Sequence, residues 1–321
     1  MASATPDEPS APSHPDADPA SEEGLPSPPD PVKFTFQSVP DLFTQLENHN
    51  HEVLEVHHVT VPNYIAIKDA RKELGREFKI FLYRPSDQTL LLAIPRAPRE
   101  ILHRRLGFLV ISQAAEMGLD EDLLDVGQLP VNSAKGTSDI SAAAGVPDDG
   151  EGEGDSVFVP VSTRGEGAFP SLVIETAWSQ PWADLHEKAR WWFEISGGDV
   201  KTVLLVKFET DHGLIKLEKW KQTESPERPG ATQTRAYESG SIIPQCVNVI
   251  TISQGPGITL HHPKRWEPSS YEVSNGDLTF DFQDIFLRDP VPPEQDIIFD
   301  KATLQQFAVR AWRSVWYHIR Q

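Results

Sequence analysis

Residues 153–160 read EGDSVFVP, and residues 170–208 read PSLVIETAWSQPWADLHEKARWWFEISGGDVKTVLLVKF. The apolar runs Ser156–Pro160, Ser171–Trp178 and Val200–Phe208 have the length and the β-branched content of buried strands. The last two runs are separated by Trp182–Ser196, which has helical spacing and ends at a pair of glycines. This stretch therefore predicts two strands, a helix and a third strand.

The flanking sequence extends this series in both directions. Pro98 opens a segment whose apolar residues follow the 3.6-residue period as far as Gly118, which predicts a helix. A weak strand is expected near Gln128–Asn132, so the order becomes α-β-β-β-α-β and the fold class α/β (α+β). Further predicted elements are a helix at Tyr64–Leu74, strands at Phe78–Tyr83, Thr89–Ile94, Ile215–Trp220, Val247–Ser253 and Leu278–Phe282, and a C-terminal helix at Thr303–Ile319.

The composition sets limits on function. The 321 residues are 38% hydrophobic and 24% charged, and they carry a net charge of −19. Such a surplus repels nucleic acid at long range, which argues against a protein that coats nucleic acid, although divalent cations at an acidic site would reverse this locally. Cys246 is the only cysteine, which excludes an intrachain disulfide and a cysteine-rich zinc cluster.

Neither a secretory signal nor a membrane-spanning segment is predicted. The N-terminal sequence MASATPDEPS has no basic region and no apolar region. The longest apolar runs are far shorter than the ~20 residues that a bilayer requires. We therefore expect an intracellular protein of the nucleus or cytoplasm with no membrane partner.

Three segments predict irregular structure. Residues 1–32 contain nine prolines, seven acidic residues and no lysine or arginine, which predicts a disordered tail that can contact a protein partner. Residues 33–321 are expected to form one domain with its core at about residues 98–222. Within this domain, residues 135–154 predict a mobile loop and residues 222–240 a surface connection.

Three charged residues interrupt the apolar pattern. Glu175 lies inside an apolar strand, where a buried carboxylate needs a cation or a hydrogen-bond donor. Lys188 lies in the inward-facing stripe of the following helix. Asp155 directly precedes the strand Ser156–Pro160 and follows a glycine-rich loop. We therefore expect Asp155, Glu175 and Lys188 to form one site.

These residues belong to a longer pattern. An aspartate before a strand that ends in proline, the motif P-x-L-V-I-E-x-A-x-S, a helix with leucine and lysine, and G-x-V-K-x-V-L follow one another within residues 153–208. The pattern resembles the restriction-endonuclease-like PD-(D/E)XK nuclease superfamily, especially its fungal members and similar bacterial restriction endonucleases. The resemblance extends more faintly from Pro98 onward. It implies an αβββαβ core with a mixed four-stranded sheet between helices.

The resemblance also implies a phosphodiester hydrolase that depends on magnesium or manganese and acts on DNA or RNA. Asp155 and Glu175 would bind the metal ion, and Lys188 would position the attacking water or the phosphate, so that these three residues form the catalytic set. The sequence departs from the family pattern at Gly154, where a proline is expected, and at Ala177, where the lysine of E-x-K is expected.

Two other functions stay open. The two departures favour a nuclease fold that has lost turnover and acts as a binding or scaffold module. A purely structural interaction protein would instead dock through its acidic tail and its 135–154 loop. The individual residues also have alternatives: Glu175 can form a structural ion pair, and Lys188 can extend its ammonium group to water. The acids that compete with Asp155 are Asp148, Asp149, Glu151 and Glu153.

Geometry separates these alternatives. Two carboxylates that share a metal ion must come within roughly 4–6 Å of each other. The structure therefore has to bring Asp155 and Glu175 together.

Overall fold

The computed structural model describes the greater part of the chain. The described residues are 32–48, 52–95, 97–126, 130–132, 150–165, 167–178, 180–209, 213–224, 242–258 and 262–319. Of the predicted tail, only Val32 is among them, as the first residue of a strand. Most of the predicted 135–154 loop and of the 222–240 connection also lies outside the described residues.

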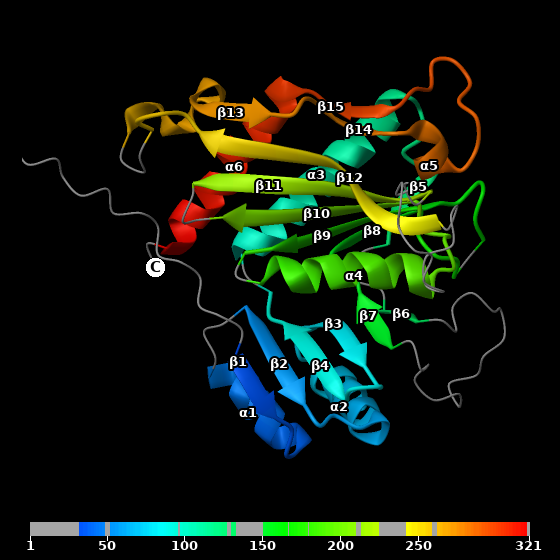
Figure 1. The fold of residues 1–321 in the computed structure, drawn as a ribbon, viewed down its shortest axis with the longest axis vertical. Coiled ribbons are helices and arrows are strands. Elements are labelled where there is room, and N and C mark those ends of the chain that lie inside the picture. The colour runs from blue at the N-terminus through cyan, green and yellow to red at the C-terminus, as the bar shows by residue number, and fades with distance from the viewer. Residues whose placement is uncertain are drawn as a thin grey trace, which may run out of the picture.

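A seven-stranded sheet, which we call the large sheet, has the order β13-β12-β11-β10-β9-β8-β5 (Figure 1). Its β9–β10 pair is parallel and its other pairs are antiparallel. Helix α4 (Trp182–Ile195) provides the crossover that a parallel pair requires. The strands are β5 (Leu123–Asp125), β8 (Ser156–Pro160), β9 (Leu172–Ala177), β10 (Thr202–Glu209), β11 (Leu214–Glu224), β12 (Ile242–Gln254) and β13 (Tyr271–Ser274).

The predicted α-β-β-β-α-β order is found in this sheet as α3 (Ala97–Glu116), β5, β8, β9, α4 and β10, and the mixed α+β class is confirmed. A strand does lie at Pro130–Asn132, within the predicted range, but it joins a different sheet. The first strand of the core order is instead Leu123–Asp125, which pairs with β8. Leu123 is buried against α3, and this packing places β5 directly after the helix.

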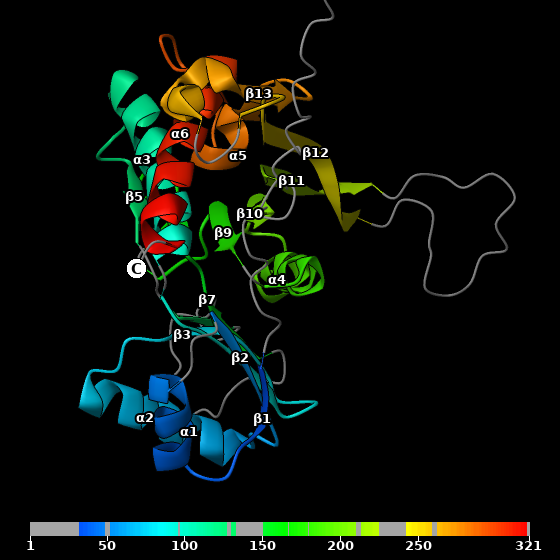
Figure 2. The ribbon, with the colours of Figure 1, turned by 90° about the vertical axis from the view of Figure 1, so that its left-hand side faces the viewer.

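Helices cover the two faces of the large sheet. Helix α3 and helix α6 (Lys301–Ile319) lie side by side on one face, and α4 lies on the other (Figure 2). The alternation along β9 matches these layers, because Leu172 and Ile174 pack in the cluster with α3 and α6 whereas Val173 packs with α4. The predicted C-terminal helix is thus confirmed.

Six other strands form a second sheet, the small sheet, in the order β1-β2-β4-β3-β7-β6. Helices α1 (Val39–Asn48) and α2 (Val61–Leu74) lie beside it, on the side away from α4 (Figure 2). The strands are β1 (Val32–Thr35), β2 (Val53–His57), β3 (Lys79–Arg84), β4 (Thr89–Ala93), β6 (Pro130–Asn132) and β7 (Glu151–Glu153).

Strand β7 corrects the prediction of a loop over residues 135–154. Glu151, Gly152 and Glu153 are buried in the small sheet, although their composition is typical of a solvated loop. Helix α2 neutralises the two glutamates, because Lys68 Nζ lies 2.7 Å from Glu151 Oε1 and Arg71 Nη1 lies 2.7 Å from Glu153 Oε1. The chain thus crosses from the large sheet to the small sheet and back between β5 and β8.

The two sheets are joined by one apolar cluster around α4. Phe81 and Leu82 of β3 pack in it with Trp192 of α4 and Val173 of β9. Helix α4 therefore lies between the two sheets (Figures 1 and 2).

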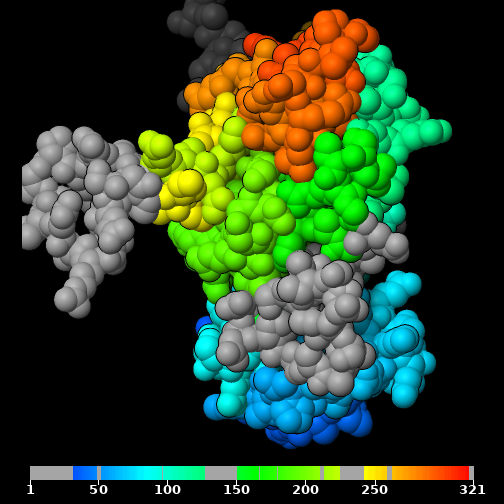
Figure 3. All heavy atoms as spheres, turned by 90° about the vertical axis from the view of Figure 1, so that its right-hand side faces the viewer, coloured from blue at the N-terminus to red at the C-terminus, as the bar shows by residue number. Residues whose placement is uncertain are grey.

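A smaller layer covers the end of the molecule that lies farthest from the small sheet (Figure 3). It contains the two-stranded sheet of β14 (Leu278–Phe280) and β15 (Ile297–Phe299) together with the short helix α5 (Phe282–Phe286). Two 3-10 turns, Pro263–Trp266 and Pro268–Ser270, precede β13. None of the helices described is long and apolar enough to cross a membrane.

Candidate functional site

Asp155 and Glu175 do come together, and the group that joins them is the ammonium of Lys79. Asp155 immediately precedes β8 and Glu175 lies in the adjacent, antiparallel β9. Lys79, the first residue of β3, enters from the small sheet. Its Nζ lies 2.7 Å from Asp155 Oδ1 and 2.9 Å from Glu175 Oε2. The three side chains are buried, with exposed fractions of 2%, 1% and 0% for Lys79, Asp155 and Glu175.

Asp155 has further partners on both oxygens. Arg99 of α3 donates from Nη2 to Oδ1 at 3.0 Å, and Thr176 donates to Oδ2 from its backbone N at 2.7 Å and from Oγ1 at 2.8 Å. Burial alone would raise the pKa of Asp155, but the charges of Arg99 and Lys79 outweigh burial and hold the pKa well below its usual range. Asp155 is therefore a carboxylate at every physiological pH.

Glu175 is held from the opposite side by α4. Trp192 Nε1 donates to Glu175 Oε1 at 2.8 Å, while Oε2 accepts from Lys79. Each carboxylate oxygen of Asp155 and Glu175 thus accepts at least one hydrogen bond from the protein. The alternative of a structural ion pair for Glu175 agrees with this arrangement.

Lys188 lies inside the protein, as its helical stripe predicts, but it has a different partner. Its Nζ donates to the Phe81 carbonyl oxygen. The β3–β4 register shifts between Ile80 and Leu82, which leaves this carbonyl outside the regular ladder. The ammonium also lies 4.0 Å from the Trp191 ring centroid. Burial lowers the pKa of Lys188 to about 7, although the charge of Glu175 opposes the shift.

The acids that compete with Asp155 occupy separate positions. Glu151 and Glu153 pair with Lys68 and Arg71 of α2, and Glu153 Oε2 also accepts from Ile80 N at 2.9 Å. Asp148 and Asp149 lie outside the described residues. Among the acids that the structure describes in this segment, Asp155 therefore meets Glu175 at Lys79.

This arrangement does not fit a magnesium or manganese ion. The position between the two carboxylates holds the Lys79 ammonium, and the other donors to their oxygens are the guanidinium of Arg99 and hydrogen-bonding groups of Thr176 and Trp192. In the described part of the chain, no three histidine, cysteine or acidic side chains gather as metal ligands would. Metal binding by Asp155 and Glu175 remains a prediction from the resemblance.

The two departures from the nuclease pattern have structural explanations. At Gly154 a Cβ atom would lie 2.4 Å from Val157 Cγ1 and 3.2 Å from Trp192 Cζ2, so a proline does not fit. Ala177 is fully buried in the apolar cluster around α4. The cation near the two acids is Lys79, which the E-x-K pattern does not predict.

Sequence reasoning missed Lys79 and Arg99. Arg99 carries a usable signal, because a positive charge in the first turn of a helix is unfavourable for the helix dipole and indicates a local anion. Lys79 begins a bulky apolar run, and nothing in that run indicates partners 76 and 96 positions downstream. Only the return of the chain to the small sheet brings these partners together.

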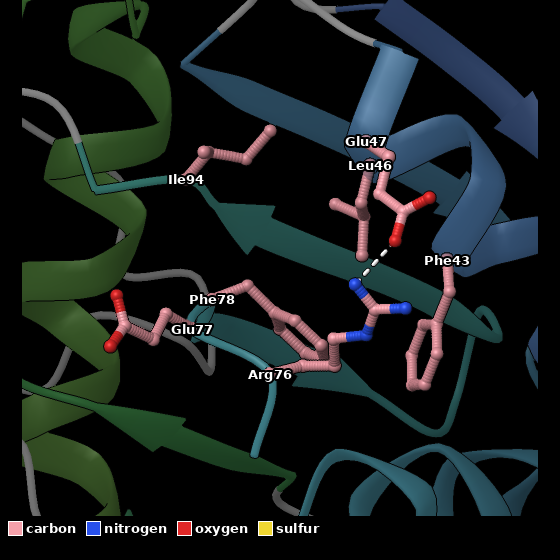
Figure 4. Close-up of a pocket in the computed structure, with 7 residues that line it drawn as sticks. All are labelled: Phe43, Leu46, Glu47, Arg76, Glu77, Phe78 and Ile94. Carbon is pink, nitrogen blue, oxygen red and sulfur yellow. Dashed lines mark hydrogen bonds and ion pairs between the residues drawn. The ribbon is translucent and has the colours of Figure 1, made fainter. Parts of the chain in front are cut away.

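A hollow lies in the small-sheet layer, at α1 (Figure 4). Its volume is about 130 Å³, and Arg76 forms an ion pair with Glu47 there while its guanidinium lies 5.7 Å from the Phe43 ring. Ligand sites for drug-sized molecules usually exceed about 300 Å³. We assign this hollow no ligand.

Gly152→Ala tests the packing of Lys188 against β7. The new methyl group would lie 2.1 Å from Lys188 Nζ and 2.9 Å from the Phe81 carbonyl oxygen. We expect urea titration to show a loss of about 1–3 kcal/mol in the free energy of unfolding. Gly165→Ala is the control, because its methyl group meets nothing within 4 Å. Equal losses in the two variants would contradict this packing.

Comparison with known proteins adds no family to these observations. No protein-family model matches the sequence, and no curated protein matches it.

Proposed function

We propose that the protein is a catalytically inactive module of the nuclease-like type that acts by binding or as a scaffold. The observation that carries this proposal is the position of Lys79, whose ammonium lies between Asp155 and Glu175. A fixed ammonium takes the place that a catalytic cation would need.

The surrounding contacts support the proposal, because they use the charged groups to connect the two sheets. Lys79 of the small sheet binds two acids of the large sheet, and Lys188 of α4 binds the Phe81 carbonyl oxygen of β3. Removing one partner from such a buried network leaves a charge without compensation. The geometry therefore favours a role in holding the two sheets together.

Two measurements on the full chain test the proposal. Linear DNA, single-stranded DNA and RNA are incubated with the protein in magnesium and in manganese, and manganese binding is followed by calorimetry. We expect no cleavage and no manganese binding tighter than about 1 mM. Cleavage that is lost in Glu175→Ala, or manganese binding that is lost in Asp155→Ala, would overturn the proposal.

Such a result would support a second candidate, the metal-dependent phosphodiester hydrolase acting on DNA or RNA that the resemblance implies. One observation favours it: Asp155 and Glu175 already reach a single cation. For this activity Lys79 would have to leave the space between the carboxylates. A protein partner for the acidic tail remains a separate proposal, which rests on composition alone.

A further inference from the structure

The outer seam between α3 and α6 forms an open groove of about 470 Å³. The two helices pack side by side along this face (Figure 2). The groove is lined by Ala97, Ile101 and Arg105 of α3 and by Arg310, Arg313, Ser314 and Tyr317 of α6. Its volume lies within the range of small-molecule sites, roughly 300–1,000 Å³.

The groove concentrates positive charge in an acidic protein. Arg105, Arg310 and Arg313 line it, and within the described residues none of the three forms an ion pair, although the chain carries a net charge of −19. The Nε atom of Arg105 is buried and lacks a hydrogen-bond partner there. Burial and the nearby charge of Arg310 both lower the pKa of Arg105. Three guanidinium groups that line one groove favour an anion between them.

Apolar and aromatic surface borders these arginines. Tyr317 and Ile101 line the groove with exposed fractions of 65% and 38%. The guanidinium of Arg105 lies 4.8 Å from the ring of Phe108, and that of Arg313 lies 5.3 Å from the ring of Trp266. An aromatic ring at this distance restricts the direction of a guanidinium group.

We propose that this groove binds a compact polyphosphate group, with Arg105, Arg310 and Arg313 on the phosphates and Tyr317 beside the rest of the ligand. Guanidinium groups match phosphate oxygens in charge and geometry. A compact anion also fits better than a long one, because the acidic surface repels an extended polyanion along its whole length. The site lies on the opposite face of the large sheet from α4, and it does not depend on the function proposed for the Lys79 cluster.

The test is calorimetry of the full chain with ATP, with tripolyphosphate and with adenosine, in EDTA. We expect ATP to bind with a Kd below about 1 mM and adenosine not to bind. Arg310→Ala and Arg105→Ala should each weaken ATP binding about tenfold, because each removes charge-assisted hydrogen bonds. Arg104→Ala is the matched control: Arg104 is the neighbour of Arg105 but pairs with Glu100, and its loss should leave ATP affinity unchanged.

The probes also identify the source of the phosphate. Tripolyphosphate binding equal to that of ATP indicates a free polyphosphate, whereas tighter binding of ATP indicates a nucleotide that uses Tyr317; both outcomes support the groove. No binding of either probe, or equal losses in Arg104→Ala and Arg310→Ala, would overturn the proposal. It would also be overturned if a single-stranded oligonucleotide or an acidic peptide bound far more tightly than ATP. Thermal melting serves as a folding control, since removing one of the two repelling charges of Arg105 and Arg310 should not lower the Tm.

Discussion

Replacing Lys79 with methionine is expected to lower the free energy of unfolding by about 3–5 kcal/mol, the range for breaking a buried ion pair at one partner. Methionine preserves the length and much of the volume of the side chain but removes its charge. Asp155 would still have Arg99 and Thr176, whereas among the described residues Glu175 would keep the Trp192 indole as its hydrogen-bond donor. The loss should therefore come mainly from Glu175, as a buried carboxylate with no cation in direct contact.

Urea titration of Lys79→Met at pH 7 measures this loss. Lys72→Met, at an exposed position of α2, is the matched control and should change stability by no more than about 0.5 kcal/mol. The double variant Lys79→Met/Glu175→Gln removes both charges, and we expect it to lose less than the sum of the two single variants. A loss below about 1 kcal/mol in Lys79→Met, or strict additivity in the double variant, would show that the ammonium is not the partner that holds Glu175.

Local periodicity was enough to predict the two helices on one face of the large sheet. Helices α3 and α6 follow from apolar residues at a spacing of 3.6. Strand β7 could not be predicted in this way, because its acidic residues are typical of a loop. The burial of Glu151 and Glu153 depends on ion pairs with Lys68 and Arg71, which lie far earlier in the chain. Prediction failed where burial depends on charge pairing between distant segments.

The candidate site, too, could be predicted only in part. That Glu175 needs a partner and that Lys188 points inward both follow from their places in a strand and a helix, and the structure bears out both expectations. The identity of the partner does not follow, because Lys79 reaches the acids from another sheet. An acid in an apolar strand thus predicts that a cation is close, but not which residue supplies it.

Between pH 7 and pH 9, stability is expected to rise in the wild-type protein, and Lys188→Met should lack this rise. Burial lowers the pKa of Lys188 from 10.5 to about 7 in the folded protein. Between these two values the unfolded chain holds a proton that the folded chain does not hold. Stability therefore increases with pH there, by up to about 1.4 kcal/mol per pH unit. Below about pH 7 both states are protonated, and Lys188 contributes no slope.

The measurement is a series of urea titrations at half-unit steps of pH. Tyrosines limit the useful pH range at its upper end. Burial raises the pKa of Tyr83 to about 12, so above pH 10 the unfolded state loses the Tyr83 proton before the folded state does. Lys72→Met should keep the wild-type slope, since its side chain is exposed. Parallel slopes for the wild type and Lys188→Met would mean that Lys188 keeps its charge in the folded protein. Lys188 would then be a second fixed cation between the sheets, and the charge of the buried network would be independent of pH over this range.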